Sequence, residues 1–128
     1  MPRRMSCSMT VGSVRDRTKT VTRRHIDTWR DLKPGDRLIL IEKGMGLPKG
    51  ARQVVLTEVE IVDVRVESIL EVDDAEVERE GMSGMFPDEF ISFWLDGHGY
   101  SSVRRHCDAR NVQCRRIEWR YLDEVAGG

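Results

Sequence analysis

The sequence predicts a small α+β domain, mainly β, in which a β-barrel carries short flanking helices. Three observations predict this class: a length of 128 residues, β-branched segments spread along the chain, and two short helical patterns between them. At about 100–200 residues per domain, the chain makes one unit, which we expect to span residues 1–122. Residues 123–128 end in two glycines and are expected to form a flexible tail.

The N-terminal residues predict a short strand and then a helical turn. Met5, Cys7 and Met9 alternate with polar neighbours, a period of two that is typical of a strand. Val11 and Val14 are three residues apart, which favours a turn of helix. No apolar stretch follows the basic N-terminus, so we expect no secretory signal. We also expect no membrane span, because no apolar run approaches about 20 residues.

The middle of the chain predicts two strands, one of them bent. Residues 17–24 are polar and rich in threonine and are expected to form a loop or an irregular strand. The Lys-Pro-Gly-Asp sequence at 33–36 is typical of a turn, and the apolar run 38–41 predicts a strand buried on both faces. Residues 53–66 alternate, with one phase slip at residues 61–62. Such a slip predicts a β-bulge in a long bent strand.

Two short helices and a closing strand are predicted for the second half. Asp73, with Glu76 three residues later, resembles a capping box, and it opens a helix that Gly81 ends. A second helix begins at residues 86–89 and ends at Gly97. Its apolar face is expected to pack in the core and consists of Phe90, Phe93 and Trp94. The alternating residues of the closing strand are Ile117, Trp119 and Tyr121.

Charge is distributed unevenly along the chain, although the net charge is −1. Residues 1–30 carry a net charge of +6, residues 58–80 carry −8, and residues 101–120 carry +4. If the two basic segments meet in space, they form an arginine-rich patch suited to phosphate or base-edge contacts. Alternatively, the opposite charges lie on a solvated surface and neutralise one another.

The cysteines and histidines predict free thiols and no metal site. Three cysteines cannot all pair within one chain, and without a secretory signal they favour a reducing cytoplasm. The residues that could in principle gather around zinc have no CxxC or other standard ligand spacing, so we expect no metal. These residues are Cys7, His98, His106, Cys107 and Cys114.

Residues 19–24 (Lys-Thr-Val-Thr-Arg-Arg) form the densest polar cluster in the sequence. Cations crowded this closely repel one another unless an anion or an acidic segment offsets them. The cluster therefore indicates a phosphate- or base-binding loop; the alternative is a solvated basic loop paired with the acids of 58–80. A tryptophan in a basic segment could stack on a base or cover an edge of the core. The residues expected to contact a nucleotide or RNA are Arg17, Thr20, Arg23, Arg24, Trp29, Arg104 and Arg105.

The same cluster resembles the ASCH domain family. The resemblance is carried by the cluster's lysine and two threonines, by Arg24 five residues after the lysine, and by Gly35-Asp36 before an apolar strand. It extends through residues 66–82 to the closing strand and covers about residues 5 to 122. It implies a small PUA-like β-barrel and an association with RNA. The family usually has glycine where this chain has Arg17; if the backbone there needs a positive φ, arginine costs on the order of 1 kcal/mol more.

The resemblance also implies an activity. One bacterial group of ASCH proteins is described as amidohydrolases that remove the acetyl group from the exocyclic nitrogen of acetylated cytidine. By motif position, the catalytic residues implied for this chain are Lys19, Thr22 and Glu80. The implied partner is a nucleoside or RNA, and neither leading mechanism needs a cofactor. Two alternatives are a non-catalytic RNA-binding module and an RNase-like activity, which we rank last because no histidine pair is well placed for it.

The implied triad has a chemical requirement. Thr22 is a poor nucleophile unless a base takes its proton. Lys19 serves only when neutral, and bringing its pKa from about 10.4 to about 7.5 requires roughly 4 kcal/mol. Burial and neighbouring arginines lower that pKa, whereas Glu80 raises it. Either Lys19 is the base and Glu80 positions it or relays its proton, or a charged Lys19 stabilises the oxyanion while Glu80 activates Thr22 or a water.

Glu80 itself lies at an unfavourable place in the sequence. A carboxylate in the last turn of a helix opposes the helix dipole by about 0.3–1 kcal/mol, and Glu76 one turn earlier adds repulsion. A locally unfavourable residue is a candidate for function. The alternative is an exposed glutamate screened by water.

Overall fold

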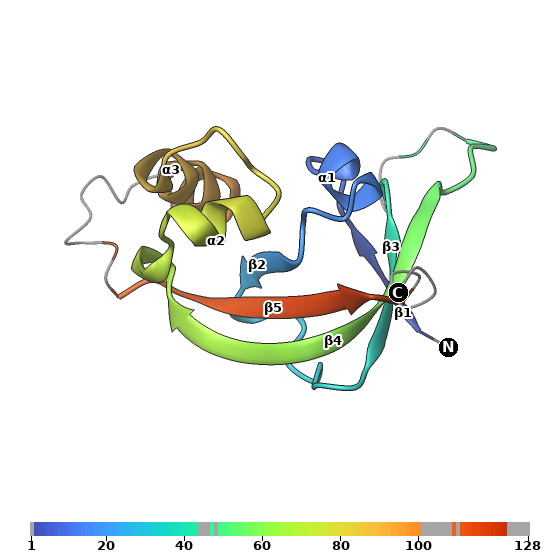
Figure 1. Ribbon diagram of the computed structural model, residues 1–128, viewed down its shortest axis with the longest axis horizontal. Helices are drawn as coiled ribbons and strands as arrows, with labels where there is room; N and C mark the ends of the chain where they lie inside the picture. The colour runs from blue at the N-terminus through green and yellow to red at the C-terminus, as the bar shows by residue number, and fades with distance from the viewer. Residues whose placement is uncertain (1, 44–46, 48, 101–108, 110, 123–128) are drawn as a thin grey trace.

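The computed structural model describes residues 2–43, 47, 49–100, 109 and 111–122 (Figure 1). Five strands form one sheet in the order β1-β3-β4-β5-β2, and only the β1–β3 pair is parallel. The chain is therefore a small α+β protein, mainly β, as predicted. The strands are β1 (Arg3–Ser6), β2 (Val21–His25), β3 (Arg37–Ile41), β4 (Val55–Ser68) and β5 (Gln113–Tyr121).

The sheet curls into half a barrel. The long strand β4 pairs with β3 along its first half and with β5 from Val59 to its end at Ser68. Its register with β5 shifts between Ile61 and Asp63, which confirms the bulge predicted from the phase slip. Among the described residues no strand ladder joins the two edge strands β1 and β2, so the curl leaves one side of the sheet open.

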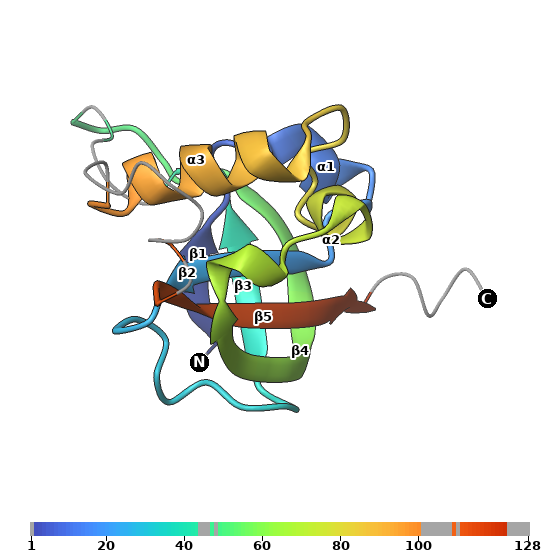
Figure 2. The ribbon, with the colours of Figure 1, turned by 90° about the vertical axis from the view of Figure 1, so that its left-hand side faces the viewer.

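Three short α-helices lie on one side of the curled sheet (Figures 1 and 2). They are α1 (Val11–Arg15), α2 (Asp74–Arg79) and α3 (Pro87–Gly97), and a 3-10 turn, η1 (Ile69–Glu71), links β4 to α2. Asp73 caps α2, since its carboxylate accepts a hydrogen bond of 2.9 Å from the Glu76 amide, as predicted. No helix in the described part of the chain is long and apolar enough to span a membrane.

The buried side chains form two clusters, and α2 and α3 cover the second. The first cluster fills the concave side of the sheet between β1, β3, β4, β5 and α1. The second lies under α2 and α3, where Phe90 and Trp94 pack on the start of β5. Arg104, Arg105 and the expected tail at 123–128 are outside the described residues.

Three details differ from the sequence-based expectations. Residues 21–25 form a regular edge strand rather than a loop or irregular strand, because Val21–His25 pairs in register with β5. Ladder pairing and the burial of Val21 outweigh the polar composition. Strand β1 ends at Ser6, so Met9 is not part of it and is 70% exposed. Phe93, expected in the core, is 38% exposed on α3.

Candidate functional site

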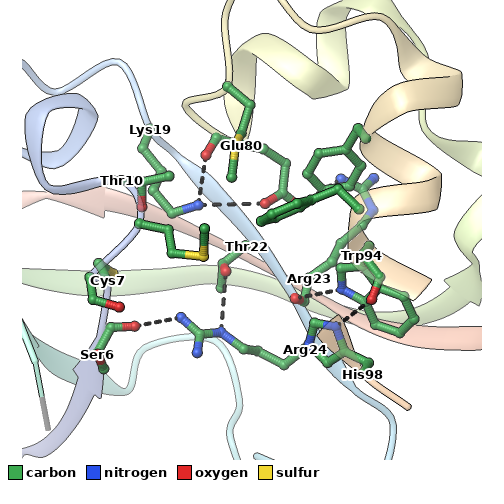
Figure 3. A pocket seen from close by; sticks show the side chains of 15 residues that line it. Ser6, Cys7, Thr10, Lys19, Thr22, Arg23, Arg24, Glu80, Trp94 and His98 are labelled. Atoms are coloured by element: carbon green, nitrogen blue, oxygen red, sulfur yellow. Dashed lines mark hydrogen bonds and ion pairs between the residues drawn. The ribbon is translucent and has the colours of Figure 1, made fainter. Parts of the chain in front are cut away.

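A pocket of about 250 Å³ lies between the two edge strands of the half-barrel, where no ladder among the described strands closes the sheet (Figure 3). One wall comes from the end of β1 and the turn after it, a second from β2, and a third from the end of α2 and from α3. The apolar part of its lining consists of Met9, Met82, Phe90, Phe93 and Trp94. The exposure of Met9 and Phe93 is thus accounted for, since both face this pocket.

Lys19 is buried at the polar end of the pocket, with a side chain only 4% exposed. Its backbone is held on both sides: the amide donates to Ser13 (3.0 Å), and the carbonyl accepts from the Trp119 indole (3.1 Å) and the Tyr121 hydroxyl. The Nζ atom donates to the backbone carbonyl of Glu80 at 2.7 Å. Burial lowers the pKa of the Lys19 amine, against the opposing effect of the Glu80 carboxylate.

Glu80 caps the C-terminus of α2 and is 4% exposed, so the exposed-glutamate alternative is wrong. Its Oε1 lies 3.5 Å from Lys19 Nζ, and its Oε2 accepts from Arg23 at 3.0 Å. The next residue, Gly81, has φ +82° and packs directly on α1, where Ser13 Oγ donates to its carbonyl at 2.6 Å. This contact sets the end of α2 against Lys19 and thereby places the glutamate in the pocket.

Thr22 and Arg24 lie on the face of β2 that points to the pocket, and Arg23, between them, lies on the opposite face. Arg24 Nε donates to Thr22 Oγ1 at 3.2 Å, which fixes the hydroxyl and leaves its proton free to be removed. Arg24 Nη2 donates to the Ser6 carbonyl at 2.8 Å and so bridges the two edge strands. Figure 3 shows the Lys19 amine, the Thr22 hydroxyl and the Glu80 carboxylate facing the same pocket.

Arg23 points into a buried ion cluster, although its backbone borders the pocket. The carboxylates around it belong to Glu67, Glu76 and Glu80. Glu76 also binds Arg116 (2.6 Å) and Arg79 (2.6 Å), and these arginines keep its pKa far below the usual range despite the burial that raises it. Arg23 of β2 and Arg116 of β5 thus meet acids of the 58–80 segment inside the protein rather than on a solvated surface.

The remaining predicted contact residues lie elsewhere. Arg17 has φ +67°, a positive value that favours glycine, and its guanidinium donates to the Val14 carbonyl at 2.8 Å, at the end of α1. Thr20 connects α2 to β5 through its backbone, accepting from the Trp119 amide and donating to the Arg79 carbonyl. Trp29 packs on the first core cluster, under the Arg3 guanidinium.

Sequence reasoning missed several polar residues of the pocket, among them Cys7 and His98. His98 stacks on Trp94 with ring centroids 4.0 Å apart, and its Nδ1 lies 2.7 Å from the Trp94 carbonyl. A carbonyl only accepts, so Nδ1 carries the proton, and burial lowers the pKa of this imidazole and favours the neutral form. Nε2 is then a hydrogen-bond acceptor. Neither residue carries a local signal, because only the fold brings them to Lys19.

Two solved structures have the same small curled-sheet fold. The first is the hypothetical protein PH0355, with 17% identity over 95% of this chain and 100% of that one and a TM-score of 0.60. The second is protein EF3133 from Enterococcus faecalis V583, described under DUF984, with 14% identity over 95% of this chain and 80% of that one and a TM-score of 0.63. No family model and no curated protein matches the chain. At these identities the likeness shows the fold alone.

Proposed function

We propose that this chain is a cytoplasmic ASCH-domain protein of the PUA-like type, and an amidohydrolase that removes the acetyl group from the exocyclic nitrogen of acetylated cytidine. One observation carries the proposal. Lys19, Thr22 and Glu80 line one pocket although they come from two segments, with Glu80 61 residues further along the chain than Lys19. This juxtaposition supplies a base, a nucleophile and a carboxylate, the set that amide hydrolysis requires.

The surroundings of Lys19 and Glu80 support Lys19 as the base. The amine is buried, its shortest contact is the neutral Glu80 carbonyl, and burial lowers its pKa. Both carboxylate oxygens of Glu80 are occupied, one by Arg23 and one by Lys19. The Arg23 guanidinium thus occupies one of the two oxygens that would have to accept the Thr22 proton. We therefore assign proton transfer to Lys19 and positioning to Glu80.

The proposed reaction proceeds through an acetyl ester. Thr22 Oγ1 attacks the amide carbonyl carbon as Lys19 takes the hydroxyl proton, and the Arg24 guanidinium beside Oγ1 stabilises the developing charge. Lys19 then gives the proton to the exocyclic nitrogen, the carbon–nitrogen bond breaks, and cytidine leaves. A water molecule, deprotonated by Lys19, then attacks the ester carbon. The bond between that carbon and Thr22 Oγ1 breaks, acetate leaves, and Lys19 returns the proton to Oγ1, which restores Thr22 and the neutral amine.

The shape and lining of the pocket favour a single nucleoside. Its volume of about 250 Å³ lies just below the roughly 300–1,000 Å³ of common ligand pockets, which favours a small ligand. Phe93, which is 38% exposed, offers a ring face on which a base can stack. His98 Nε2 is an acceptor that can receive the N–H of an acetylated amine. A flat duplex or a long strand has no comparable fit here.

The direct test is turnover of acetylated cytidine to cytidine and acetate by the purified protein. We expect Lys19→Ala to abolish turnover while circular dichroism shows an intact fold, since general-base removal alone costs about 10²–10⁴-fold. Lys33→Ala is the matched control, because the Lys33 side chain is 76% exposed in a turn, and it should retain wild-type turnover. Wild-type turnover no higher than that of a heat-killed control would refute the proposal.

The RNA-binding alternative has a separate signature. A module that holds phosphates loses RNA affinity steeply as salt rises, with a slope set by the number of phosphates neutralised. The buried ion pairs of Arg23 remove one cation from such a surface. If the site takes a single nucleoside, we expect the affinity for RNA, measured by calorimetry between low and high salt, to change little. Steep salt dependence without any turnover would favour the RNA-binding module.

A further inference from the structure

Arg23 lies at the centre of three carboxylates and is completely buried, with a side chain 0% exposed. Its Nη1 donates to Glu80 Oε2 at 3.0 Å, and its Nη2 donates to Glu67 at 2.9 Å and to Glu76. Its Nε is buried without a hydrogen-bond partner among the described residues. The guanidinium is thus oriented by the carboxylates at its outer end, and one of these is the pocket residue Glu80.

The Glu80 carboxylate lies closer to the Arg23 guanidinium than to the Lys19 amine. The contact to Arg23 is 3.0 Å, whereas the contact to Lys19 Nζ is 3.5 Å. The Arg23 guanidinium keeps its proton, since arginine is charged at every ordinary pH. Arg23 therefore holds the carboxylate, and the Lys19 amine is left with a backbone carbonyl as its closest partner at 2.7 Å.

The other groups that face the Lys19 amine do not supply the negative charge that Glu80 supplies. Arg24 faces it from β2 and opposes its protonation, while the Cys7 thiol faces it from the end of β1. Burial raises the pKa of Cys7, so that thiol is neutral. From β5, the Trp119 ring centroid lies 5.9 Å from Nζ. Glu80 is thus the carboxylate through which the charge of Lys19 is set, and Arg23 controls its position.

We propose that Arg23 is a positioning residue that draws the Glu80 carboxylate away from Lys19 and so keeps the amine available as a neutral base. Its guanidinium acts from inside the protein, through Glu80, and makes no contact with substrate. The importance of this device for catalysis rests on the proposed function. The charge relation between Arg23, Glu80 and Lys19 does not, and it can be measured without substrate.

The test is an NMR titration of the lysine side chains. The chain has four lysines, so ¹³C-labelled lysine gives few signals, and a Lys19→Arg variant assigns the buried one. In Arg23→Gln the freed carboxylate turns to Lys19 and a cation is lost, so the Lys19 titration midpoint should rise by about 1 pH unit or more. Glu67→Gln removes a competing carboxylate from Arg23, so the midpoint should fall.

One variant serves as a control for this titration, and another replaces Arg23→Gln if that variant does not fold. Arg120→Gln is the control, because Arg120 pairs with Glu60 on the exposed side of β4 and β5, and the midpoint should stay at the wild-type value. If Arg23→Gln does not fold, Arg23→Lys and Glu67→Gln carry the test, with the midpoint expected to rise and fall respectively. An unchanged midpoint in the variants that fold would overturn the proposal.

Activity separates this inference from the proposed function. If the wild type deacetylates acetylated cytidine, the acid limb of kcat/KM should move with the NMR midpoint in each variant. Midpoint shifts in a protein without turnover would leave the charge relation standing and refute the proposed function. Turnover with the same midpoint and the same acid limb in every variant would leave the function standing and refute the role of Arg23.

Discussion

Replacing Gly81 with alanine tests the contact that sets Glu80 against Lys19. A Cβ at Gly81 would lie 2.6 Å from the Ser13 Cβ and 3.0 Å from the Lys19 Cβ, and the backbone φ is +82°. The positive φ costs an alanine about 1–2 kcal/mol, and forcing a methyl group into occupied space costs about 1–3 kcal/mol more. The sum, about 2–5 kcal/mol, is a large part of the 5–15 kcal/mol that stabilises a typical domain.

Gly84→Ala separates these two contributions. Gly84 has a similar φ of +95°, but a Cβ added there would meet nothing within 4 Å among the described residues, so only the backbone cost applies. In urea unfolding, Gly81→Ala should be less stable than Gly84→Ala by about 1–3 kcal/mol. Turnover should fall in Gly81→Ala alone, because the end of α2 must move away from Ser13. Equal stability of the two variants would refute the close packing described here.

Three further predictions concern the ionisable groups. Glu76→Gln should lose about 3–5 kcal/mol in urea unfolding, since it leaves buried Arg23 and Arg116 without their shared partner. The folded-state pKa of Glu76 lies below its unfolded value of 4.5, so the stability that Glu76 contributes is present above that pH and is lost as pH falls. Between pH 5 and pH 2 the stability of Glu76→Gln should therefore decline less than that of the wild type. An equal decline in the two proteins would contradict this assignment. Burial raises the pKa of Cys114 to about 12, so an aromatic disulfide reagent should modify this thiol only after unfolding. Mass spectrometry of the Cys114 peptide measures the labelling, and rapid labelling in the folded protein would contradict the prediction. The acid limb of the pH profile of kcat/KM should lie below the ordinary lysine pKa of about 10.4. It should disappear from any residual activity of Lys19→Ala. An acid limb at about 10.4 would show that the pKa of Lys19 is not lowered.

Local signals in the sequence predicted most of the elements. The capping pair at Asp73 and Glu76 and the phase slip at residues 61–62 each depend on neighbours within a few positions, and the structure contains both features. Edge-strand pairing is different, because it depends on β5, which is about 90 residues further along the chain. The polar stretch around Val21 therefore looked irregular in isolation.

The pocket was predictable only in part. Missing the strand also hid the direction of Arg23, because a period of two would have put it on the face opposite to Thr22 and Arg24. Its charge alone gave no indication that it would be buried among glutamates from α2 and β4. Arg17 illustrates a conditional expectation: its backbone does have a positive φ, the condition under which arginine costs more than glycine, and its side chain donates to the end of α1.

A crystal structure of Lys19→Ala with acetylated cytidine tests the central claim most directly. This variant keeps the Thr22 hydroxyl and the Arg24 contact but lacks the base, so the bound amide should persist. The account predicts the nucleoside in the pocket between β1, β2 and α3, with the acetyl carbonyl carbon about 3–3.5 Å from Thr22 Oγ1. A nucleoside bound at another face, or an acetyl group turned away from Thr22, would contradict it.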